Sequence, residues 1–539
     1  MRVADIVIKA LQEEGITTVF GHPGGANLPL YDALRLCPAV RHVLVRNEQA
    51  AAHAASGYAR ASGKTGACFA TSGPGATNLM TGIATAYMDS IPMIAITGQV
   101  KTDLIGKDVF QEADVVGATD SFTKHNYLVK DAADIPRILA EAFYIARTGR
   151  PGPVLIDIPR DILDARIPFS ALPEVNIPGY NPTVKGHAGQ IKRALQKLSS
   201  AKRPIILAGG GVIAAGAVVE LREFATRGRI PVINTLMGLG SFPMGSDLFA
   251  GLMGYHGDDH VKEILMMSDY LIIAGSRLSD RATMNFKALS PETTLVHMDI
   301  DPAEIGKVFD HQIPVVGDLK QILKKFNEKV TLMDTGEWIE TLKAMKPREE
   351  PLVIEKTQTI CPKTAMRVLS QKVDYRTILV ADVGQNQIIA ARNFPYSGER
   401  MYMTSGGLGT MGYSLPAAIG ASFGAPGRTV VSVVGDGGLQ MLLAELGTLR
   451  QSGNKVVVML LNNNRLGMVR ELQDDQFSGN YFGVEWELSP DFLKIAQAYD
   501  IKGRRIFSND ELEGAIDEAL ASEGAFFVEC MVDPADNCL

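Results

Sequence analysis

A single glutamate stands out in the stretch VRNEQAAAHAASGYARASG, which begins at Val45. Glu48 lies where a strand-like stretch gives way to an alanine-rich segment of helical character. A buried carboxylate without a partner is costly, and such a group usually takes up a proton instead. Arg46 and His53 are close in sequence, but their spacing suggests no obvious acid–base triad with Glu48. The sequence predicts a functional carboxylate whose partner lies elsewhere, and the ordinary alternative is a helix-start glutamate near Arg46.

A second candidate site follows two buried strands in the last third of the chain. TVVSVVGDGGLQMLLAEL is typical of a strand, a glycine loop with Asp436 and a helix, whose start suits an anion such as phosphate. KVVVMLLNNNRLGM is another buried strand that ends in Asn462, Asn463 and Asn464. Neighbouring parallel strands would bring Asp436 and an asparagine together at the carboxyl edge of the sheet. One carboxylate, one amide oxygen and phosphate oxygens suit Mg²⁺ on a diphosphate, whereas a solvated turn beside an asparagine-rich cap is the ordinary alternative.

The elements that must position these residues alternate between helix and strand along the whole chain. This alternation predicts an α/β protein of mostly parallel sheets with helices on both faces. Linker-like stretches at 165–186 and 346–364 divide the chain into predicted domains at residues 1–180, 187–335 and 360–539. The outer two share the order helix, glycine turn, buried strand, Gly-rich loop and helix, which predicts a duplicated domain. The middle domain has the strand–turn pattern of a Rossmann-like fold.

Composition limits the class of protein and its partners. The 539 residues are 46% hydrophobic and carry a net charge of −7 with both signs mixed, so we expect no nucleic-acid partner. The 5 cysteines form no close pairs, which argues against a disulfide framework or a zinc site and favours a reducing cytoplasm. The chain starts directly in an amphipathic helix and its apolar stretches are short, so we expect a cytoplasmic protein without membrane contact.

The Gly-Asp-Gly sequence around Asp436 and the later Asn-Asn resemble the diphosphate motif of thiamine diphosphate enzymes. Further segments in all three predicted domains resemble the catalytic subunit of the acetolactate (acetohydroxyacid) synthase family. They include GHPGGANLPLYDAL, TSGPGATNLMTGIATAYMDSIPMIAITGQV, FQEADVVGATDSFTKHNYLV and SGGLGTMGYSLPAAIGA. The resemblance extends nearly from one end of the chain to the other.

This resemblance implies that the first domain binds the aminopyrimidine ring of thiamine diphosphate and that the third binds its diphosphate with Mg²⁺. The two parts come from different subunits, which implies a homodimer or homotetramer and leaves room for a small regulatory subunit. Glu48 then contacts the ring nitrogen and relays the proton transfer that gives the thiazolium carbanion. The implied reaction decarboxylates pyruvate and condenses the hydroxyethyl carbanion with a second 2-keto acid, mainly pyruvate, giving 2-acetolactate and CO₂ for branched-chain amino acid biosynthesis or an acetoin pathway.

The resemblance also assigns site residues by position. The catalytic residues are Glu48, Gln111, Phe110, Gly25 and Arg160, and the substrate pocket contains Met468 and Leu472. The residues expected to bind thiamine diphosphate are Pro23, Asn78, Gln385, Gly409, Met411, Asp436, Gly437, Gly438, Asn463, Gly467 and Met468. The metal ligands are Asp436, Asn463 and the main-chain oxygen of Arg465. An FAD with a non-redox role is expected on Arg150, His256, Gly275, Arg277, Arg281, Asp299, Ile300 and Asp318.

Several positions depart from the family pattern. Asn386 replaces a histidine and Arg160 replaces a lysine, while the flavin segment that starts at Arg277 keeps both arginines but one aspartate of two. Leu472 replaces the tryptophan of enzymes that prefer 2-ketobutyrate as acceptor. One methylene in an apolar pocket is worth about 1–3 kcal/mol, so we expect this preference to be largely lost.

Three alternatives stay open at this point. Another thiamine diphosphate enzyme, such as a sulfoacetaldehyde acetyltransferase, an oxalyl-CoA decarboxylase or a pyruvate oxidase, would share the cofactor motifs and differ in its substrate pocket. A flavin- or nicotinamide-dependent oxidoreductase would explain the middle domain but not the paired outer domains. A non-catalytic relative would be expected to lack Glu48 or Asp436, and both are present.

Overall fold

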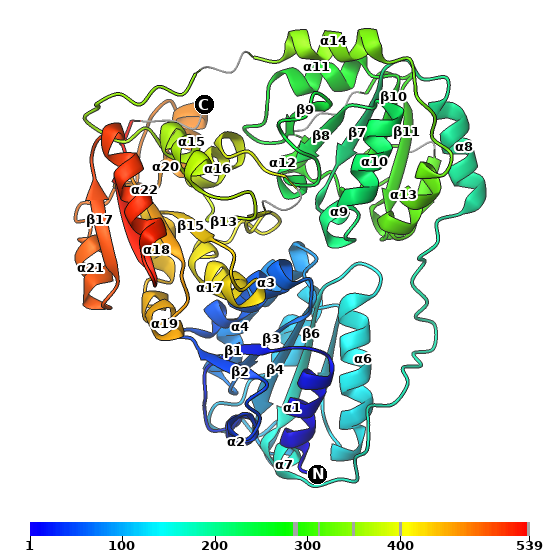
Figure 1. The fold of residues 1–539 in the computed structure, drawn as a ribbon. Coiled ribbons are helices and arrows are strands. Elements are labelled where there is room, and N and C mark those ends of the chain that lie inside the picture. Colours follow the sequence, from blue (N-terminus) through cyan, green and yellow to red (C-terminus); the bar gives the residue numbers. More distant parts are fainter. Residues whose placement is uncertain (284–288, 311–312, 348–350, 398–400, 536–539) are drawn as a thin grey trace.

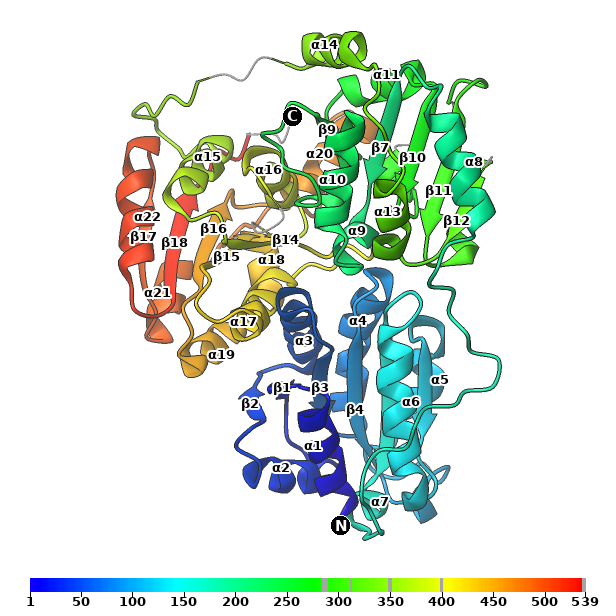
Figure 2. The ribbon, with the colours of Figure 1, turned by 45° about the vertical axis from the view of Figure 1, so that its right-hand side comes forward.

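The computed structural model describes residues 1–283, 289–310, 313–347, 351–397 and 401–535. These residues form three 6-stranded sheets, one after another along the chain, with helices packed around each (Figures 1 and 2). The pairings between the named strands are parallel throughout. The predicted α/β class with parallel sheets is therefore confirmed.

The first sheet has the strand order β2-β1-β3-β4-β6-β5. Its strands are β1 (Thr18–Gly21), β2 (Arg41–Leu44), β3 (Gly66–Ala70), β4 (Met93–Gln99), β5 (His125–Leu128) and β6 (Pro153–Pro159). The helices around it are α1 (Val3–Glu13), α2 (Leu28–Arg35), α3 (Glu48–Ser62), α4 (Pro74–Met88), η1 (Thr102–Leu104), α5 (Val115–Thr119), η2 (Asp120–Phe122), η3 (Ala132–Asp134), α6 (Ile135–Arg147) and α7 (Arg160–Asp164). One hydrophobic cluster packs α1 and α6 on one face, and another packs α3 and α4 on the other.

The third sheet, β14-β13-β15-β16-β18-β17, repeats the strand order of the first sheet strand for strand. Its strands are β13 (Ile378–Ala381), β14 (Met401–Met403), β15 (Val430–Gly435), β16 (Val457–Asn462), β17 (Lys502–Ile506) and β18 (Phe526–Met531). The helices around it are α15 (Pro362–Lys372), α16 (Gln385–Asn393), α17 (Ser414–Gly424), α18 (Asp436–Met441), α19 (Glu445–Ser452), α20 (Gly467–Phe477), α21 (Phe492–Ala498), η6 (Asn509–Glu511) and α22 (Leu512–Ala521). The predicted relation between the outer domains is therefore confirmed at the level of topology.

The middle sheet has a different order, β12-β11-β10-β7-β8-β9, which is the 3-2-1-4-5-6 arrangement of a Rossmann fold. Its strands are β7 (Pro204–Ala208), β8 (Val232–Thr235), β9 (Phe249–Met253), β10 (Tyr270–Ala274), β11 (Thr294–Asp299) and β12 (Ile313–Val316). The helices around it are α8 (Ala188–Leu198), α9 (Gly210–Ala214), α10 (Val218–Gly228), η4 (Leu236–Gly238), α11 (His260–Met267), α12 (Asp280–Thr283), η5 (Pro302–Glu304), α13 (Leu319–Asn327) and α14 (Gly336–Met345). Trp338 of α14 is buried and donates to the Pro204 carbonyl at 3.2 Å, so this helix continues the middle domain beyond residue 335.

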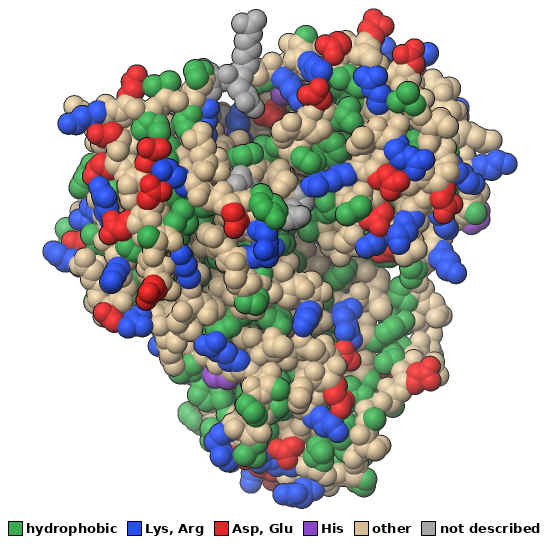
Figure 3. All heavy atoms as spheres, viewed as in Figure 1, with side chains coloured by type: hydrophobic (Ala, Val, Ile, Leu, Met, Phe, Trp, Pro, Cys, Tyr) green, Lys and Arg blue, Asp and Glu red, His purple; other side chains and the backbone are tan. Residues whose placement is uncertain are grey.

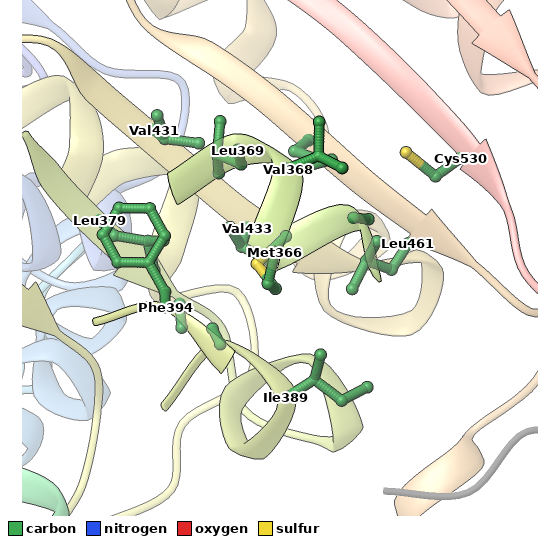
Figure 4. Close-up of a cluster of buried hydrophobic side chains, with 14 of the residues drawn as sticks. Met366, Val368, Leu369, Leu379, Ile389, Phe394, Val431, Val433, Leu461 and Cys530 are labelled. Atoms are coloured by element: carbon green, nitrogen blue, oxygen red, sulfur yellow. The ribbon is translucent and has the colours of Figure 1, made fainter. Parts of the chain in front are cut away.

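A hydrophobic layer packs helices against the central strands of the third sheet (Figure 4). Met366 and Leu369 of α15 and Ile389 of α16 pack against Val433 of β15 and Leu461 of β16. Close packing of this kind resists volume changes, because interiors are as dense as organic crystals. The layer therefore attaches α15 and α16 to the central strands β15 and β16.

The first and third domains meet where α3 crosses α17 (Figures 1 and 2). Both helices are rich in glycine and alanine along the line of contact, and this lets their backbones approach closely. A Cβ atom on Gly57 would lie 2.0 Å from the Ala417 carbonyl oxygen, and one on Gly420 would lie 1.8 Å from that of Ala54. Glycine is therefore required at both positions by space, not by backbone conformation.

The surface drawn in Figure 3 carries Lys and Arg side chains interspersed with Asp and Glu over all three domains. This mixture agrees with the even charge pattern of the sequence. None of the helices in the described part of the chain combines the length and the apolar character needed to cross a bilayer.

We predict that Gly420→Ala lowers the stability of the junction between α3 and α17. The added methyl group would meet the Ala54 carbonyl, and overpacking costs about 1–3 kcal/mol, more than the roughly 1 kcal/mol that alanine gains in helix propensity. Thermal unfolding followed by circular dichroism should show a lower midpoint. Gly336→Ala is the matched control, because no atom lies within 4 Å of its Cβ position, and its midpoint should stay unchanged. Equal midpoints for the two variants would contradict the packing account.

Candidate active site

A pocket opens at the carboxyl edge of the third sheet, where β13, β15 and β16 end. β14 lies on one side of β13 and β15 on the other, so the strand order reverses here, which is where open α/β sheets bind ligands. All described residues that line the pocket come from the third domain. The predicted residues among them are Gln385, Met411, Asp436, Gly437, Gly438, Asn463, Arg465, Gly467 and Met468. Gly409 and Leu472 are not part of this lining.

The three predicted metal ligands converge in this pocket. The amide oxygen of Asn463 lies 3.2 Å from Oδ1 of Asp436 and 2.9 Å from the main-chain oxygen of Arg465. Octahedral Mg²⁺ with bonds of about 2.0–2.1 Å places neighbouring ligand oxygens roughly 3 Å apart. Oxygens at this spacing repel one another unless a cation or a proton lies between them. The donor set therefore fits Mg²⁺, with the remaining ligands to come from phosphate and water.

Asp436 supplies the single carboxylate of this set. The residue is almost fully buried, and burial raises the pKa of its carboxyl to about 6, while hydrogen bonds oppose this shift. Trp486 Nε1 donates one of them, to Oδ2, at 2.8 Å, which leaves Oδ1 on the side of Asn463. The described residues contain no cluster of three or more His, Cys, Asp or Glu side chains arranged for a metal, so a cation here would rely on neutral oxygens and phosphate for its other ligands.

Glu48 is the first residue of α3 and is 9% exposed. Asn78 of α4 donates from Nδ2 to Glu48 Oε2 at 3.0 Å, so the structure brings these two predicted residues together. The two ionisable neighbours in sequence have other contacts: Arg46 donates to the Leu44 carbonyl at 2.8 Å, and the His53 ring lies against Gln49. Glu48 is therefore held by an amide, and neither Arg46 nor His53 completes an acid–base triad with it.

Two further predicted residues meet in the loops that follow β1 and β6. Arg160 begins α7, directly after β6, and its Nη1 donates to the carbonyl oxygen of Gly25 at 2.7 Å. Pro23 lies in the same loop as Gly25 and is exposed. The contact places a guanidinium at the carboxyl edge of the first sheet, the edge at which Glu48 and Asn78 also lie.

Phe110 and Gln111 lie in the segment between η1 and α5. The Phe110 side chain is 87% exposed, and Gln111 has a φ of 60°, which is unusual for a residue other than glycine. The main chain of Gln111 packs on Gly73, the N-cap of α4, where a Cβ atom would come within 2.9 Å of it. The loop is thereby attached to the helix that carries Asn78, and Phe110 projects from it into solvent.

The carboxyl edge of the middle sheet contains several of the residues predicted to bind FAD. The strand order reverses between β7 and β10, and Gly275 follows β10 there with a φ of 61°. Arg277 lies two residues later, and burial lowers its pKa although nearby carboxylates, including Asp299, act in the opposite direction. Burial raises the pKa of the Asp299 carboxyl to about 6, and Ile300 follows it after β11. The residues predicted to bind FAD therefore include Gly275, Arg277, Asp299 and Ile300 at the edge where the strand order reverses, which is where open α/β sheets bind ligands.

The other predicted flavin residues make contacts within the protein. Arg150 Nη1 pairs with Glu304 Oε1 at 2.9 Å, and Asp318 is the N-cap of α13. Arg281 lies over an aromatic ring, and His256 Nε2 is 3.7 Å from the carboxylate of Glu471, a residue of the third domain. The middle domain therefore touches the third domain near the pocket.

Sequence patterns did not single out Glu445 or Asp89, two carboxylates that join the first and third domains. Glu445 of α19 is fully buried and accepts hydrogen bonds from the main-chain N–H groups of Arg46 and Asn47, both at 2.9 Å. Asp89, directly after α4, accepts hydrogen bonds from the main-chain N–H groups of Gly406 and Gly407. These two glycines lie in the loop that leads to Gly409 and Met411. The start of α3 and the loop to Met411 are thus each held by the other domain, over sequence separations that no local pattern reveals.

Family models of thiamine pyrophosphate enzymes match the chain in three places. The N-terminal TPP binding domain matches residues 1–118, the central domain residues 191–326 and the C-terminal TPP binding domain residues 382–530. Full-length relatives agree with these matches. A probable acetolactate synthase large subunit of Methanocaldococcus jannaschii is 45% identical over 99% of this chain and 93% of its own length. The acetolactate synthase isozyme 3 large subunit of Escherichia coli is 42% identical, over 99% and 95%.

A third relative, the acetolactate synthase large subunit of Lactococcus lactis, is 40% identical over 99% of this chain and 93% of its own length. The three relatives are thus 40–45% identical to this chain over nearly the whole of both sequences. The strand orders and the converging oxygens described above agree with this similarity. The chain therefore belongs to the thiamine pyrophosphate enzymes and, among them, to the family of the acetolactate synthase large subunits.

Proposed function

We propose that this chain is an acetolactate synthase that decarboxylates pyruvate and joins the remaining two-carbon unit to a second 2-keto acid, mainly pyruvate, giving 2-acetolactate and CO₂. The observation that supports it most directly is a pair of half-sites: a buried glutamate that accepts a hydrogen bond from an amide, and three oxygens whose spacing suits Mg²⁺. The relatives named above carry the name of the same activity. Another thiamine diphosphate enzyme would not be expected to resemble this family along the whole chain.

Each half-site has a distinct chemical task. When bound, thiamine diphosphate supplies a nucleophilic carbon and an electron sink for the loss of CO₂. Asp436, Asn463 and the Arg465 carbonyl would hold the Mg²⁺ that anchors the diphosphate. Glu48 would exchange a proton at its carboxylate with the aminopyrimidine ring, and Asn78 keeps Oε2 of that carboxylate in position. The Glu48 carboxylate is itself almost fully buried, and a hydrogen bond is stronger in such surroundings than in water.

A complete site requires two copies of the chain in this proposal. The lining of the pocket comes from the third domain alone, whereas Glu48 and Asn78 belong to the first domain. A homodimer or homotetramer in which the first domain of one subunit faces the third domain of another would unite them. The relatives are called large subunits, which supports a small subunit as a further partner.

An FAD in the middle domain belongs to the same proposal, bound beside Arg277 and Asp299. Its support is the reversal of strand order between β7 and β10 and the arginine that lies among carboxylates there. Decarboxylation and ligation transfer no net electrons, so the flavin would have a structural role.

We predict that Glu48→Gln lowers kcat by at least roughly 100-fold, because an amide cannot exchange the proton and a positioned acid–base group contributes about 10²–10⁴-fold. Pyruvate, thiamine diphosphate and Mg²⁺ would be incubated with the protein, and the products identified by NMR. Glu13→Gln makes the same change at an exposed position of α1 and should retain full activity. Failure of the wild-type protein to form acetolactate would refute the proposed reaction, and an active Glu48→Gln variant would refute the role of Glu48.

The sharing of the site between subunits predicts complementation. Glu48→Gln and Asp436→Ala homodimers should each be inactive, whereas mixed dimers should regain activity, because one of their two sites contains both intact residues. The two tagged variants would be co-expressed, the mixed species isolated and acetolactate formation measured. Mixed dimers without activity would place Glu48 and Asp436 of a single chain in the same site.

The leucine at position 472 leads to a prediction about the preference between pyruvate and 2-ketobutyrate as acceptor. In a mixture of pyruvate and 2-ketobutyrate, the wild-type protein should form no strong excess of 2-aceto-2-hydroxybutyrate. Leu472→Trp should raise the ratio of this product to acetolactate by up to about 10–200-fold, the range that one methylene group supports. Leu472→Met keeps an aliphatic side chain and serves as the control. A strong preference for 2-ketobutyrate in the wild-type protein would contradict this role of Leu472.

A further inference from the structure

A chain of three side chains lies behind the candidate metal ligand Asn463. Asn463 donates from Nδ2 to Gln385 Oε1 at 2.9 Å. Gln385, the first residue of α16, donates in turn from Nε2 to Glu471 Oε1 at 2.5 Å. Glu471 lies on α20, and its side chain is 11% exposed. The series connects the pocket with a carboxylate to which the proposed function gives no task.

The chemistry of the last member determines the orientation of the other two. A carboxylate accepts hydrogen bonds and cannot donate them, whereas an amide can present either its oxygen or its NH₂ group. Glu471 therefore requires the NH₂ group of Gln385, which turns Gln385 Oε1 toward Asn463. That oxygen in turn requires the NH₂ group of Asn463, so the Asn463 oxygen faces Asp436 and Arg465.

The opposite orientation of Asn463 shows why this matters. With the amide turned round, its nitrogen would donate to Asp436 Oδ1 at 3.2 Å and to the Arg465 carbonyl at 2.9 Å. This arrangement satisfies both oxygens without a cation and removes one of the three metal ligands. It also sets the Asn463 oxygen 2.9 Å from Gln385 Oε1, so two acceptors would face each other. Two contacts favour the metal-binding orientation: Asn463 Nδ2 donates to Gln385 Oε1, and Asn463 Oδ1 accepts a longer hydrogen bond from the Arg465 main-chain N–H at 3.3 Å. The first depends on Glu471, which keeps Gln385 Oε1 turned toward Asn463.

Gly467 leaves the space that this series needs. A Cβ atom at this position would lie 1.8 Å from Gln385 Oε1 and 2.7 Å from Asn463 Nδ2. Glu471 follows four residues later on α20, and residues at this spacing share one face of a helix. The start of α20 therefore provides both the gap for the two amides and the carboxylate that orients them.

We propose that Glu471 is a positioning residue that sets the orientation of the metal ligand Asn463 through Gln385. The inference rests on the Mg²⁺ site of the proposed function and names a residue that acts on that site without touching the metal. Outer partners of metal ligands commonly change metal affinity by about 10–100-fold when they are removed. Loss of Glu471 should therefore act on the affinity for Mg²⁺ and not on the chemical step.

The test is a Mg²⁺ titration of Glu471→Ala in the presence of saturating thiamine diphosphate. Trp486 donates to Asp436, so its fluorescence should report metal binding, and a Trp338→Phe background leaves it as the remaining tryptophan of the 2 in the chain. We expect Mg²⁺ to bind about 10–100-fold more weakly than in the background protein. The kcat measured at saturating Mg²⁺ should return close to the background value, whereas general damage to the fold would not be rescued by the metal.

Two further variants keep the inference falsifiable. Glu471→Gln can still offer an oxygen to Gln385 and should bind Mg²⁺ more tightly than Glu471→Ala. Asp475→Ala changes an exposed carboxylate on the same helix and should leave the titration unchanged. The double variant Gln385→Ala/Glu471→Ala should lose no more affinity than Gln385→Ala alone, because residues in one series do not add.

The outcomes separate the two levels of the proposal. A background protein whose Trp486 fluorescence and activity do not respond to Mg²⁺ would overturn the metal site itself. A background protein that responds, together with Glu471→Ala at the same affinity or with fully additive losses in the double variant, would overturn the role of Glu471 alone.

Discussion

The proposed Mg²⁺ site constrains the third domain, because it needs three oxygen ligands to lie at about the spacing of an octahedral cation site. Asp436, Asn463 and the Arg465 carbonyl would repel one another without a positive charge between them, so the surrounding structure must keep them in place. It does so from several directions. Asp436 and Asn463 follow the paired strands β15 and β16. Trp486 donates a hydrogen bond to Oδ2 of Asp436, and Gln385 accepts one from Nδ2 of Asn463.

The first and third domains hold each other's functional segments. Glu445 of the third domain bonds the N–H groups just before Glu48, while Asp89 of the first domain bonds the loop that leads to Met411. Burial raises the pKa of both carboxyls, whereas the main-chain hydrogen bonds favour their charged forms. Breaking either contact would leave an uncompensated buried acceptor, which is a strong penalty. The close packing of α3 against α17 adds to these hydrogen bonds between the two domains. We therefore expect the first and third domains of one chain to keep a fixed relative position.

Local sequence reasoning could predict which residues lie close together where their positions depend on neighbouring strands. Asp436 and Asn463 each come directly after a buried strand, and the ends of parallel neighbours share one edge of the sheet, so their proximity could be predicted from the sequence. The repeated order of the outer sheets was visible as a repeated pattern. Glu471, Glu445 and the contact of Trp486 could not be predicted, because their partners lie on elements whose approach is decided only by tertiary packing.

The contacts between the first and third domains also explain why Glu48 and the pocket of the third domain would come from different chains in the proposed site. Glu48 is attached through Glu445 to the third domain of its own chain, yet the pocket of that domain is lined without any residue of the first. Moving Glu48 into its own pocket would break those hydrogen bonds and open the α3–α17 crossing. Pairing two chains would keep both the hydrogen bonds to Glu445 and the α3–α17 contact within each chain. A symmetric dimer contact would also complete two sites at once. The proposed dimer is therefore the smallest assembly that satisfies both the fold and the chemistry.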